Sequence, residues 1–457
     1  MAHYAGVERS LLAGQGDQAI QIIEDAKDEY GNKSRLLYLM DHGMVLHLAG
    51  EYTKSNAVLE EAHLLIEDLY TKRFRDEAAS LLVNEARQPY EGEPYEHVMV
   101  NVIKGLNYAL LQQWNEALVE ARRIDHRLNV LGDKEKGKDT YQEDPFARYL
   151  VGLLYDIAGD LNNAYVGYRK AEHIYQENVG WTRVALPDVL KRDLIRTATR
   201  LGLQNEAKQY QELYPEVASQ RSTKIAKNLA QIVVVTYHGQ GPRKEDLFID
   251  VPVSLDALAL VAATKPGFRG SSRRTRGGKA LLYGIHGRIA RIALPRFTLH
   301  EKYQALDSIQ IRSRSTSLLT QSQRMYDIHA VAEKSLADGY DSLVLRAVAR
   351  TAIKMATAEG IALGARAAVG KKHRDLVGPL VGGLARVFAL ATEEADIRSW
   401  RTLPGEIQLA RIWVKPGAYS VAINSRDIQF NAPTPISSAH LQLKAGETQF
   451  LLQQNGR

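Results

Sequence analysis

The stretch Arg148–Ala171, RYLVGLLYDIAGDLNNAYVGYRKA, predicts two short amphipathic helices joined by a tight Gly-Asp turn. Gly152 is a small residue at a point where two helices must touch. Tyr155 follows on the same face of the first helix, and Gly159 opens the turn. The second helix carries its matching face at the i, i+4 and i+7 positions, in Ala164, Tyr168 and Ala171.

This order of small and large residues is typical of the tetratricopeptide (TPR) repeat, in which helix pairs stack because one pair cannot bury its apolar face alone. The same spacing recurs in Gly14, Ala19, Ile23 and Ala26; in Leu39, Gly43, Gly50, Leu59 and Ala62; in Gly105, Tyr108, Trp114, Ala117 and Ala121; and in Gly202, Ala207 and Tyr210. The sequence therefore predicts a TPR-like α-solenoid over residues 1–216, with an unrelated helical bundle as the alternative. Such solenoids bind peptides or helices in a groove.

Composition sets the outer limits on function. The chain has 457 residues, which is enough for two or three domains, and its net charge of +6 leaves nucleic acid, lipid headgroups or an acidic protein as partners. It has no cysteine, which excludes disulfides, thiolate chemistry and cysteine-based zinc sites. No apolar run reaches the roughly 18 residues that a membrane-spanning helix needs. The first residues do not read as a signal peptide, so we expect either a cytosolic protein or one whose leader has been removed.

The hydrophobic period changes after Pro215. A polar linker is predicted over 217–228, and the β-branched run Ile232–Val235 predicts a buried strand. Residues 229–400 are predicted to form an α+β domain with Ala-rich helices and a mostly antiparallel sheet, and 280–297 is read as strand. A small C-terminal β-hairpin subdomain is predicted over 401–457, with turns at 415–417 and 444–446. The fold class is mainly α: a solenoid followed by an α+β domain.

Two insertions interrupt the predicted repeats. Residues 74–86 predict an extra helix, and the connector after it, RQPYEGEPYEH, alternates Tyr90 and Tyr95 with glutamates. We interpret this connector as a loop packed on the solenoid, with a partner-binding insertion as the alternative. Residues 132–144 predict a polar surface loop.

The motifs tested for chemistry predict no catalytic, cofactor-binding or metal site. The Gly-rich pieces at 239–246, 267–279 and 284–288 lack the lysine and hydroxyl pair of a P-loop and the full GxGxxG pattern. The histidines do not form a His-Glu-x-x-His motif, and no serine lies in a GxSxG elbow. His238, with Glu245 and Asp246 nearby in sequence, is the one acid–base candidate, and a turn histidine that binds its own loop is the preferred reading.

A basic stretch lies within this second half and contains a Gly-rich loop. We interpret the loop as a contact for phosphate-rich headgroups or an acidic protein surface, with a merely solvated loop as the alternative. Aromatic residues are sparse there, which argues against stacking on nucleic acid. The loop residues are Arg269, Arg273, Arg274, Arg276 and Lys279, and the stretch continues through Arg288, Arg291 and Arg296.

The segment ADIRSWRTLPGEIQLARIWVKPGAYSV (395–421), together with HGQGPRKED, ALPRF and NYALLQQWNEALVEARR, resembles an uncharacterised family of bacterial TPR-containing envelope lipoproteins, often found near curli-export-pore-like proteins. The motif residues are Arg398, Trp400, Leu403 and Pro404. The resemblance implies a lipoprotein at the periplasmic face of the outer membrane and implies no catalytic residue. From the residues themselves, we expect Trp400 to anchor the helical run onto the terminal β-domain and Pro404 to end the connector, in preference to ligand binding.

These observations favour a non-enzymatic scaffold that binds a protein partner through the solenoid, within an envelope secretion or surface-assembly system. One alternative is a cytosolic adaptor whose basic loop binds nucleic acid or a membrane surface. The other is an enzyme of unknown chemistry in the α+β half, which requires His238, Glu245 and Asp246 to converge. The small-residue helical surfaces within 342–395 also predict self-association.

Overall fold

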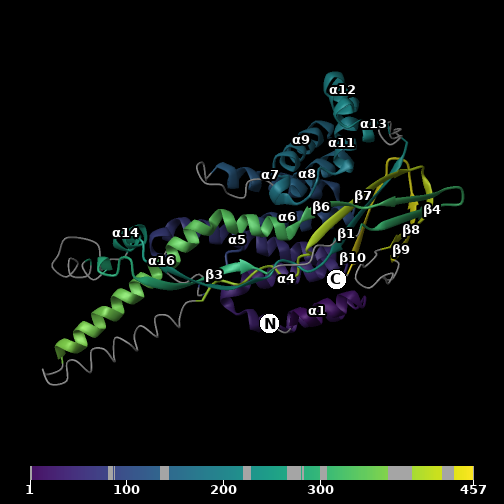
Figure 1. Ribbon diagram of the computed structural model, residues 1–457. Helices are drawn as coiled ribbons and strands as arrows, with labels where there is room; N and C mark the ends of the chain where they lie inside the picture. Colours follow the sequence, from purple (N-terminus) through teal and green to yellow (C-terminus); the bar gives the residue numbers. More distant parts are fainter. Residues whose placement is uncertain are drawn as a thin grey trace.

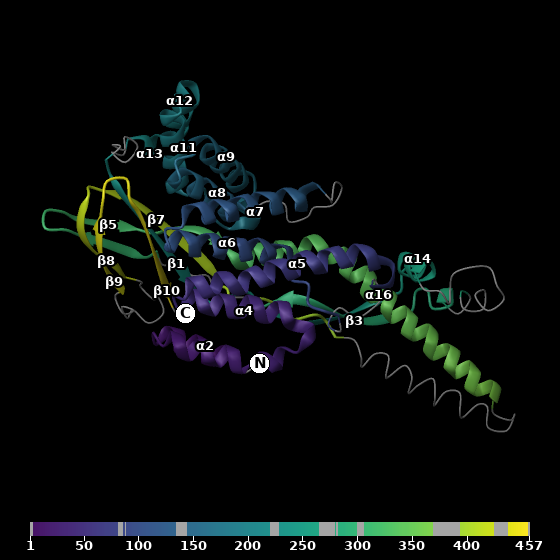
Figure 2. The ribbon, with the colours of Figure 1, turned by 180° about the vertical axis from the view of Figure 1, so that it is seen from behind.

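A computed structural model of the chain describes residues 3–80, 86, 88–133, 144–219, 228–264, 279, 282–298, 306–368, 394–424 and 437–455. A helical first half packs on one face of a four-stranded sheet, and a second four-stranded sheet covers the opposite face (Figure 1). A long helix, α16 (Ile328–Ala368), projects from this body beside a two-stranded ribbon (Figures 1 and 2). The chain therefore combines a mainly helical half with separate sheets.

The helical half is a series of hairpins, each of which packs on the next along the chain. Its helices are α1 (His3–Leu12), α2 (Gly16–Asp25), α3 (Lys27–Tyr30), the 3₁₀ helix η1 (Asn32–Ser34), α4 (Arg35–Leu48), α5 (Tyr52–Ser80), α6 (Pro94–Leu110), α7 (Trp114–Asp133), α8 (Pro145–Ile157), α9 (Leu161–Glu177), α10 (Val179–Thr182), α11 (Asp188–Arg200), α12 (Gln204–Leu213) and α13 (Pro215–Ala218). The pairs are α1 with α2, α4 with α5, α6 with α7, α8 with α9, and α11 with α12. Helix α5 runs unbroken through residues 74–80, where the sequence predicted a separate extra helix.

Left-handed residues make the tight turns between paired helices. Gly50 and Gly159 have φ values of 84° and 90°, which a residue with a side chain rarely adopts. Gln112 takes this place between α6 and α7, with a φ of 58°. The third hairpin therefore turns in the same way without a glycine.

Glycines also lie where paired helices touch. A Cβ added to Gly152 would lie 2.6 Å from Cδ1 of Tyr168 and 3.0 Å from the carbonyl oxygen of Ala164. One added to Gly43 would lie 2.5 Å from Cδ2 of Leu59. Only a residue without a side chain allows this approach, so these glycines set the distance between the helices of each pair.

The strands that the structure describes in the second half form three sheets. They are β1 (Ala230–His238), β2 (Lys244–Pro252), β3 (Ile289–Phe297), β4 (Ser308–Arg312), β5 (Ser317–Gln321), β6 (Gln323–Asp327), β7 (Glu406–Val414), β8 (Gly417–Asn424), β9 (Ser437–Leu443) and β10 (Thr448–Asn455). The strand orders are β10-β1-β7-β6, β5-β4-β8-β9 and β2-β3. All of the pairs are antiparallel except β1 with β10, which is parallel.

Strand β1 is buried along its whole length and lies at the centre of the molecule. Val234 is paired with Leu451 of β10 on one side and with Ala410 of β7 on the other. Because side chains alternate along a strand, Ile232 and Val234 pack toward the second sheet, whereas the odd-numbered positions from 233 to 237 belong to the core of the helical half. The strand predicted from the β-branched run thus links both cores.

The two hairpin turns predicted within 401–457 are wrong. Strands β7 and β8 flank the turn at 415–417 but do not pair, because β7 lies in the first sheet and β8 in the second. The turn at 444–446 likewise connects β9 of the second sheet to β10 of the first. Strand β1 pairs with both β7 and β10, β4 pairs with β8, and β9 pairs with β8, so 401–457 is built into the sheets of the preceding segment.

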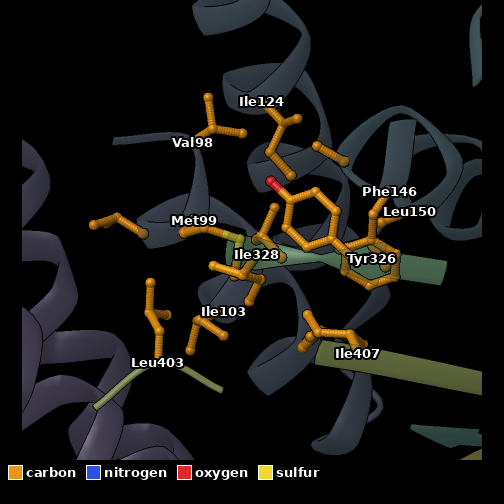
Figure 3. Close-up of a cluster of buried hydrophobic side chains, with 14 of the residues drawn as sticks. Val98, Met99, Ile103, Ile124, Phe146, Leu150, Tyr326, Ile328, Leu403 and Ile407 are labelled. Atoms are coloured by element: carbon orange, nitrogen blue, oxygen red, sulfur yellow. The ribbon is translucent and has the colours of Figure 1, made fainter. Parts of the chain in front are cut away.

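Helices of the first half and strands of the second share one core. Side chains from α6 and α8 surround Tyr326 of β6, Ile407 of β7 and the adjacent Leu403 (Figure 3). The rings of Phe146 and Tyr326 stack with their centroids 5.5 Å apart. The boundary between the predicted domains is therefore a continuous apolar interface.

The projecting arm has its own smaller core. Alanines of α16 pack on α14 (Leu255–Thr264) and on β3, around Leu258, Ile292 and Ala349. The sequence predicted strand over 280–297, whereas residues 282–287 form a helical turn and the strand begins at Ile289. Of the second predicted Ala-rich stretch, 375–395, all but the last two residues lie outside the described residues. Within the described ranges, no helix combines the length and apolar character needed to cross a membrane.

Candidate functional site

The two sides of the stacked hairpins have different surroundings. We call the side formed by α4, α6 and α8 the first-helix face, and the side formed by α5, α7 and α9 the second-helix face (Figure 2). The first-helix face is covered by the second half of the same chain. Several of its buried polar residues bind side chains or backbone groups of that half; these include Asp41, His47, Glu96 and Asp156.

Asp41 of α4 is a buried carboxylate that joins the N-terminal helix to the segment before β7. Its Oδ2 accepts hydrogen bonds from the hydroxyls of Tyr4 at 2.7 Å and Tyr30 at 2.8 Å. Its Oδ1 accepts from the hydroxyl of Thr402 at 2.7 Å. Burial raises the pKa of Asp41, although each of these donors favours the charged form.

Glu96, at the start of α6 in the next hairpin, is a second buried carboxylate that binds the segment before β7. It accepts hydrogen bonds from the Tyr90 hydroxyl at 2.7 Å and from the backbone N–H groups of Trp400 at 2.8 Å and Glu93 at 2.9 Å. Glu93 and Glu96 also form a capping box at the start of α6. The connector that carries Tyr90 is therefore packed into the interior.

The family-like motif binds the helical half. The Trp400 side chain is 0% exposed, and its Nε1 donates to the hydroxyl of Thr402 at 3.0 Å. Arg398 donates to the carbonyl oxygens of Lys33 and Gln88, and Leu403 is buried. The sequence predicted that Trp400 anchors the helical run onto the terminal strands. In the structure it instead joins α4 and α6 to the segment that ends at Pro404.

The titration of Glu96 gives a test of this interface. Burial, reinforced by the charge of Glu93, raises the pKa of Glu96 to about 7. A raised folded-state pKa contributes stability that is present below the unfolded-state pKa and is lost as pH rises through 7. We expect the free energy of unfolding of the wild type, relative to Glu96→Gln, to fall by about 3 kcal/mol between pH 4.5 and pH 7.5. Urea unfolding at both pH values measures this, and equal differences at the two pH values would contradict it.

A buried charge cluster joins β7 to two helices, α8 and α11. Arg411 of β7 contacts Asp156 of α8 at 2.6 Å and Asp193 of α11 at 2.7 Å, and Arg196 of α11 binds both carboxylates. The Arg411 guanidinium lies 4.8 Å from the centre of the Trp413 ring. Burial opposes the charged forms, but the two guanidinium groups hold the pKa of Asp156 well below its usual range. The two positive and two negative charges compensate one another inside the protein.

A chain of hydrogen bonds runs from β1 through α4 and α6 to α5. Burial lowers the pKa of His47 to about 4, so its imidazole is neutral at pH 7 and carries one N–H. Asn107 donates to Ser55 and Asn56, each at 2.9 Å, so its Oδ1 accepts from His47 Nδ1 at 2.5 Å. His47 Nε2 then accepts from the Tyr237 hydroxyl at 3.1 Å. This order fixes the Asn56 amide with its oxygen toward Asn107.

Two grooves lie on the second-helix face. One, of about 400 Å³, is lined by residues of α5, the end of α6 and α7, and the other, of about 250 Å³, is lined by α7, α8 and α9. We call them the α5–α7 groove and the α7–α9 groove. Tyr108 lines the first and Tyr155 the second, at equivalent positions of the repeat signature. Val119 and Val166 occupy equivalent positions on α7 and α9, and they are 38% and 49% exposed.

The α5–α7 groove is walled by charged residues that the sequence motifs did not identify. Lys104 Nζ lies 2.9 Å from Glu120 Oε1 and also contacts Glu60, and Arg123 donates to Glu60 at 2.7 Å. Although burial opposes it, the Arg123 and Lys104 contacts lower the pKa of Glu60 to about 2. In the sequence, Lys104 stands out because it lies within the apolar sequence of α6, where a buried lysine needs a carboxylate partner.

The residues proposed for acid–base chemistry do not form a site. His238 lies 2.9 Å from Asp307, Glu245 pairs with Arg296 across the ribbon at 2.7 Å, and Asp246 accepts from the backbone N–H of Ala395. Among the residues that the structure describes, no cluster of three or more potential metal ligands occurs. The convergence required by the enzyme hypothesis is therefore not found.

Most of the basic loop lies outside the residues that the structure describes. Arg269, Arg273, Arg274 and Arg276 fall outside the described residues, and Lys279 is half-buried. Farther along the basic stretch, Arg291 and Arg296 form exposed ion pairs with Asp250 and Glu245 across the β2–β3 ribbon. These two arginines are partly neutralised, so the expected contact with headgroups or an acidic protein rests on the loop alone.

Comparisons with known proteins give limited likeness. No protein-family model and no curated protein matches the chain. A MamA fragment from Desulfovibrio magneticus RS-1 is 16% identical, with 49% of this chain and 96% of that one covered at a TM-score of 0.30. A kinesin light chain with nearly identical TPR-like repeats from Podospora anserina is 13% identical, with 48% and 96% covered at a TM-score of 0.29. Both are TPR-like repeat proteins.

Proposed function

We propose that this protein is an interaction scaffold that binds a protein partner on the second-helix face. The observation that carries the proposal is the asymmetry of the hairpins. Their first helices are covered by the chain's own strands, whereas the second helices carry two neighbouring grooves and exposed valines at equivalent positions. Repeated surface features suit an elongated ligand that crosses several repeats. The second half of the chain then holds the array in one shape.

The setting of this function is proposed from the resemblance to envelope lipoproteins. This resemblance suggests that the scaffold lies at the periplasmic face of the outer membrane, within a secretion or surface-assembly system. A cytosolic adaptor that uses the basic loop is the second candidate setting. Self-association through the Ala-rich helices belongs to the same proposal.

Photo-crosslinking in cells tests the binding face. With p-benzoylphenylalanine in place of Val119 or Val166, we expect one discrete adduct shared by both positions, because both side chains lie on the same face. The control position is Leu255 at the start of α14, which is 56% exposed and lies outside the helical half. Equal adducts at all three positions, or none at the valines, would contradict the proposal. Fractionation of the adduct into membrane and soluble material tests the setting.

A further inference from the structure

The α5–α7 groove contains polar atoms that the folded chain leaves without partners. Glu120 is 2% exposed, and its Oε1 binds Lys104 and Arg123, but its Oε2 has no hydrogen-bond partner. Asn56 is 6% exposed, and its Nδ2 is likewise unpaired because the hydrogen bond from Asn107 fixes the amide with its oxygen inward. Both residues line the groove. Buried polar atoms without partners are uncommon, because each loses its hydrogen bonds to water.

The charges around the groove leave one carboxylate in excess. Glu60, Glu116 and Glu120 line it, and the cations in contact with them are Arg123 of the wall and the buried Lys104. Glu116 is exposed and forms no ion pair with any residue that the structure describes. Burial raises the pKa of Glu120 more than the contacts with Lys104 and Arg123 lower it. The groove therefore favours a ligand with a positive charge.

Part of the remaining wall is apolar. Tyr108, Leu111 and Val119 line the groove beside the carboxylates. A long aliphatic stem can pack on these side chains while the charged end of the side chain reaches Glu120 and Glu116. We propose that the α5–α7 groove binds a lysine side chain of the partner, with a carbonyl oxygen of the partner backbone accepting a hydrogen bond from Asn56 Nδ2.

Lysine fits this groove better than arginine does. Glu120 offers a single free oxygen, since its other oxygen is held by Lys104. An ammonium group is a compact charge that one oxygen can bind, whereas a guanidinium group gains most from a carboxylate with both oxygens free. The geometry therefore favours lysine at this position.

The neighbouring α7–α9 groove provides an internal comparison. When Ala117 is placed over Ala164, Glu120 corresponds to Gly167 and Lys104 to Val151. The α7–α9 groove keeps the tyrosine and the exposed valine but has no buried carboxylate at the position of Glu120. Gly167 cannot carry a side chain there, because an added Cβ would lie 2.8 Å from the backbone of Gly152. Lysine selectivity is therefore assigned to the α5–α7 groove.

Peptide pools test this inference, which rests on the proposed function. The probes are fluorescein-labelled, capped heptapeptides with randomised flanks and a central lysine, arginine, norleucine or glutamate. Anisotropy with the full-length protein is expected to give about tenfold tighter binding of the lysine pool than of the norleucine pool. Arginine should fall between them, and glutamate should bind most weakly. Equal affinity for lysine and norleucine would overturn the inference.

Two substitutions locate the binding site. Glu120→Gln keeps the volume and the oxygen that binds Lys104, and it replaces only the unpaired oxygen with an amide nitrogen. We expect it to reduce affinity for the lysine pool about tenfold and to leave the norleucine pool unchanged. Exposed Glu116→Gln, which has no part in the buried network, should give a smaller loss in the same direction. Lys170→Gln in the α7–α9 groove is the matched control and should change neither pool.

The outcomes separate the two proposals. An adduct at Val119 without lysine preference would overturn the lysine site and leave the scaffold standing. Lysine binding that depends on Glu120, without any adduct at Val119 or Val166, would support the site and contradict the scaffold. Unchanged lysine binding in both Glu120→Gln and Glu116→Gln would show that the peptides bind elsewhere and would overturn the inference.

Discussion

Arg411→Met is expected to lower the free energy of unfolding by about 3–5 kcal/mol, because it leaves two buried carboxylates with one guanidinium group. Arg411 is buried and contacts Asp156 at 2.6 Å and Asp193 at 2.7 Å. Methionine has a similar reach but offers neither charge nor donor, and the hydroxyl of Tyr168 also loses the hydrogen bond that Arg411 donates at 3.0 Å. The measurement is urea unfolding followed by far-UV circular dichroism.

A surface arginine gives the matched control. Arg291 forms a two-contact ion pair with Asp250, at 2.9 and 3.0 Å, but both side chains are exposed on the β2–β3 ribbon. Solvent weakens such a pair, so Arg291→Met should leave the midpoint of urea unfolding close to that of the wild type. If Arg411→Met costs no more than this control, the buried cluster does not hold β7 against the helices.

Local sequence patterns predicted the helical half well because its determinants lie close together along the chain. Gly152 meets Tyr168 in the partner helix of its own hairpin, and Gly50 and Gly159 supply the left-handed turns. Each of these features depends on residues within a single repeat. Spacing therefore carries the information, and a single sequence is enough to find it.

The pairing of the strands could not be predicted in this way, because the strands that pair with β1 lie far from it along the chain. The β-branched run in β1 predicted a buried strand but gave no sign that β10 would pair with it in parallel and β7 on its other edge. The hairpin prediction for 401–457 failed because turn residues at 415–417 specify a change of direction and not which sheet receives the next strand. The order of strands in the two sheets depends on which apolar faces remain to be buried, and this is not a local property of the sequence.

The amino-acid composition of α6 is consistent with a first-helix face that is covered by other parts of the chain. Helix α6 is buried at nearly every position, including Glu96, Lys104 and Asn107, and polar residues are rarely buried unless they have partners. A helix of a two-layer hairpin stack would instead show one exposed side. The partner of Glu96 is unpredictable from one sequence, because Trp400 lies 304 residues away along the chain. The grooves on the second-helix face depend on Glu120 and Asn56, whose unpaired atoms only coordinates reveal.

Trp400→Ala is expected to lower the free energy of unfolding by about 3–5 kcal/mol, because it empties a fully buried site between the two halves. It also removes the Nε1 hydrogen bond to Thr402, whose hydroxyl binds Asp41 of α4. If the halves form one folding unit, helix α4 and strand β1 should lose hydrogen-exchange protection together. Ile397→Ala, in the same segment but 45% exposed, is the control and should change stability by less than about 0.5 kcal/mol. Loss of protection in β1 alone, with α4 unchanged, would show that the helical half keeps its structure without the strands. The strands that cover the first-helix face would then not determine how the helical hairpins are arranged.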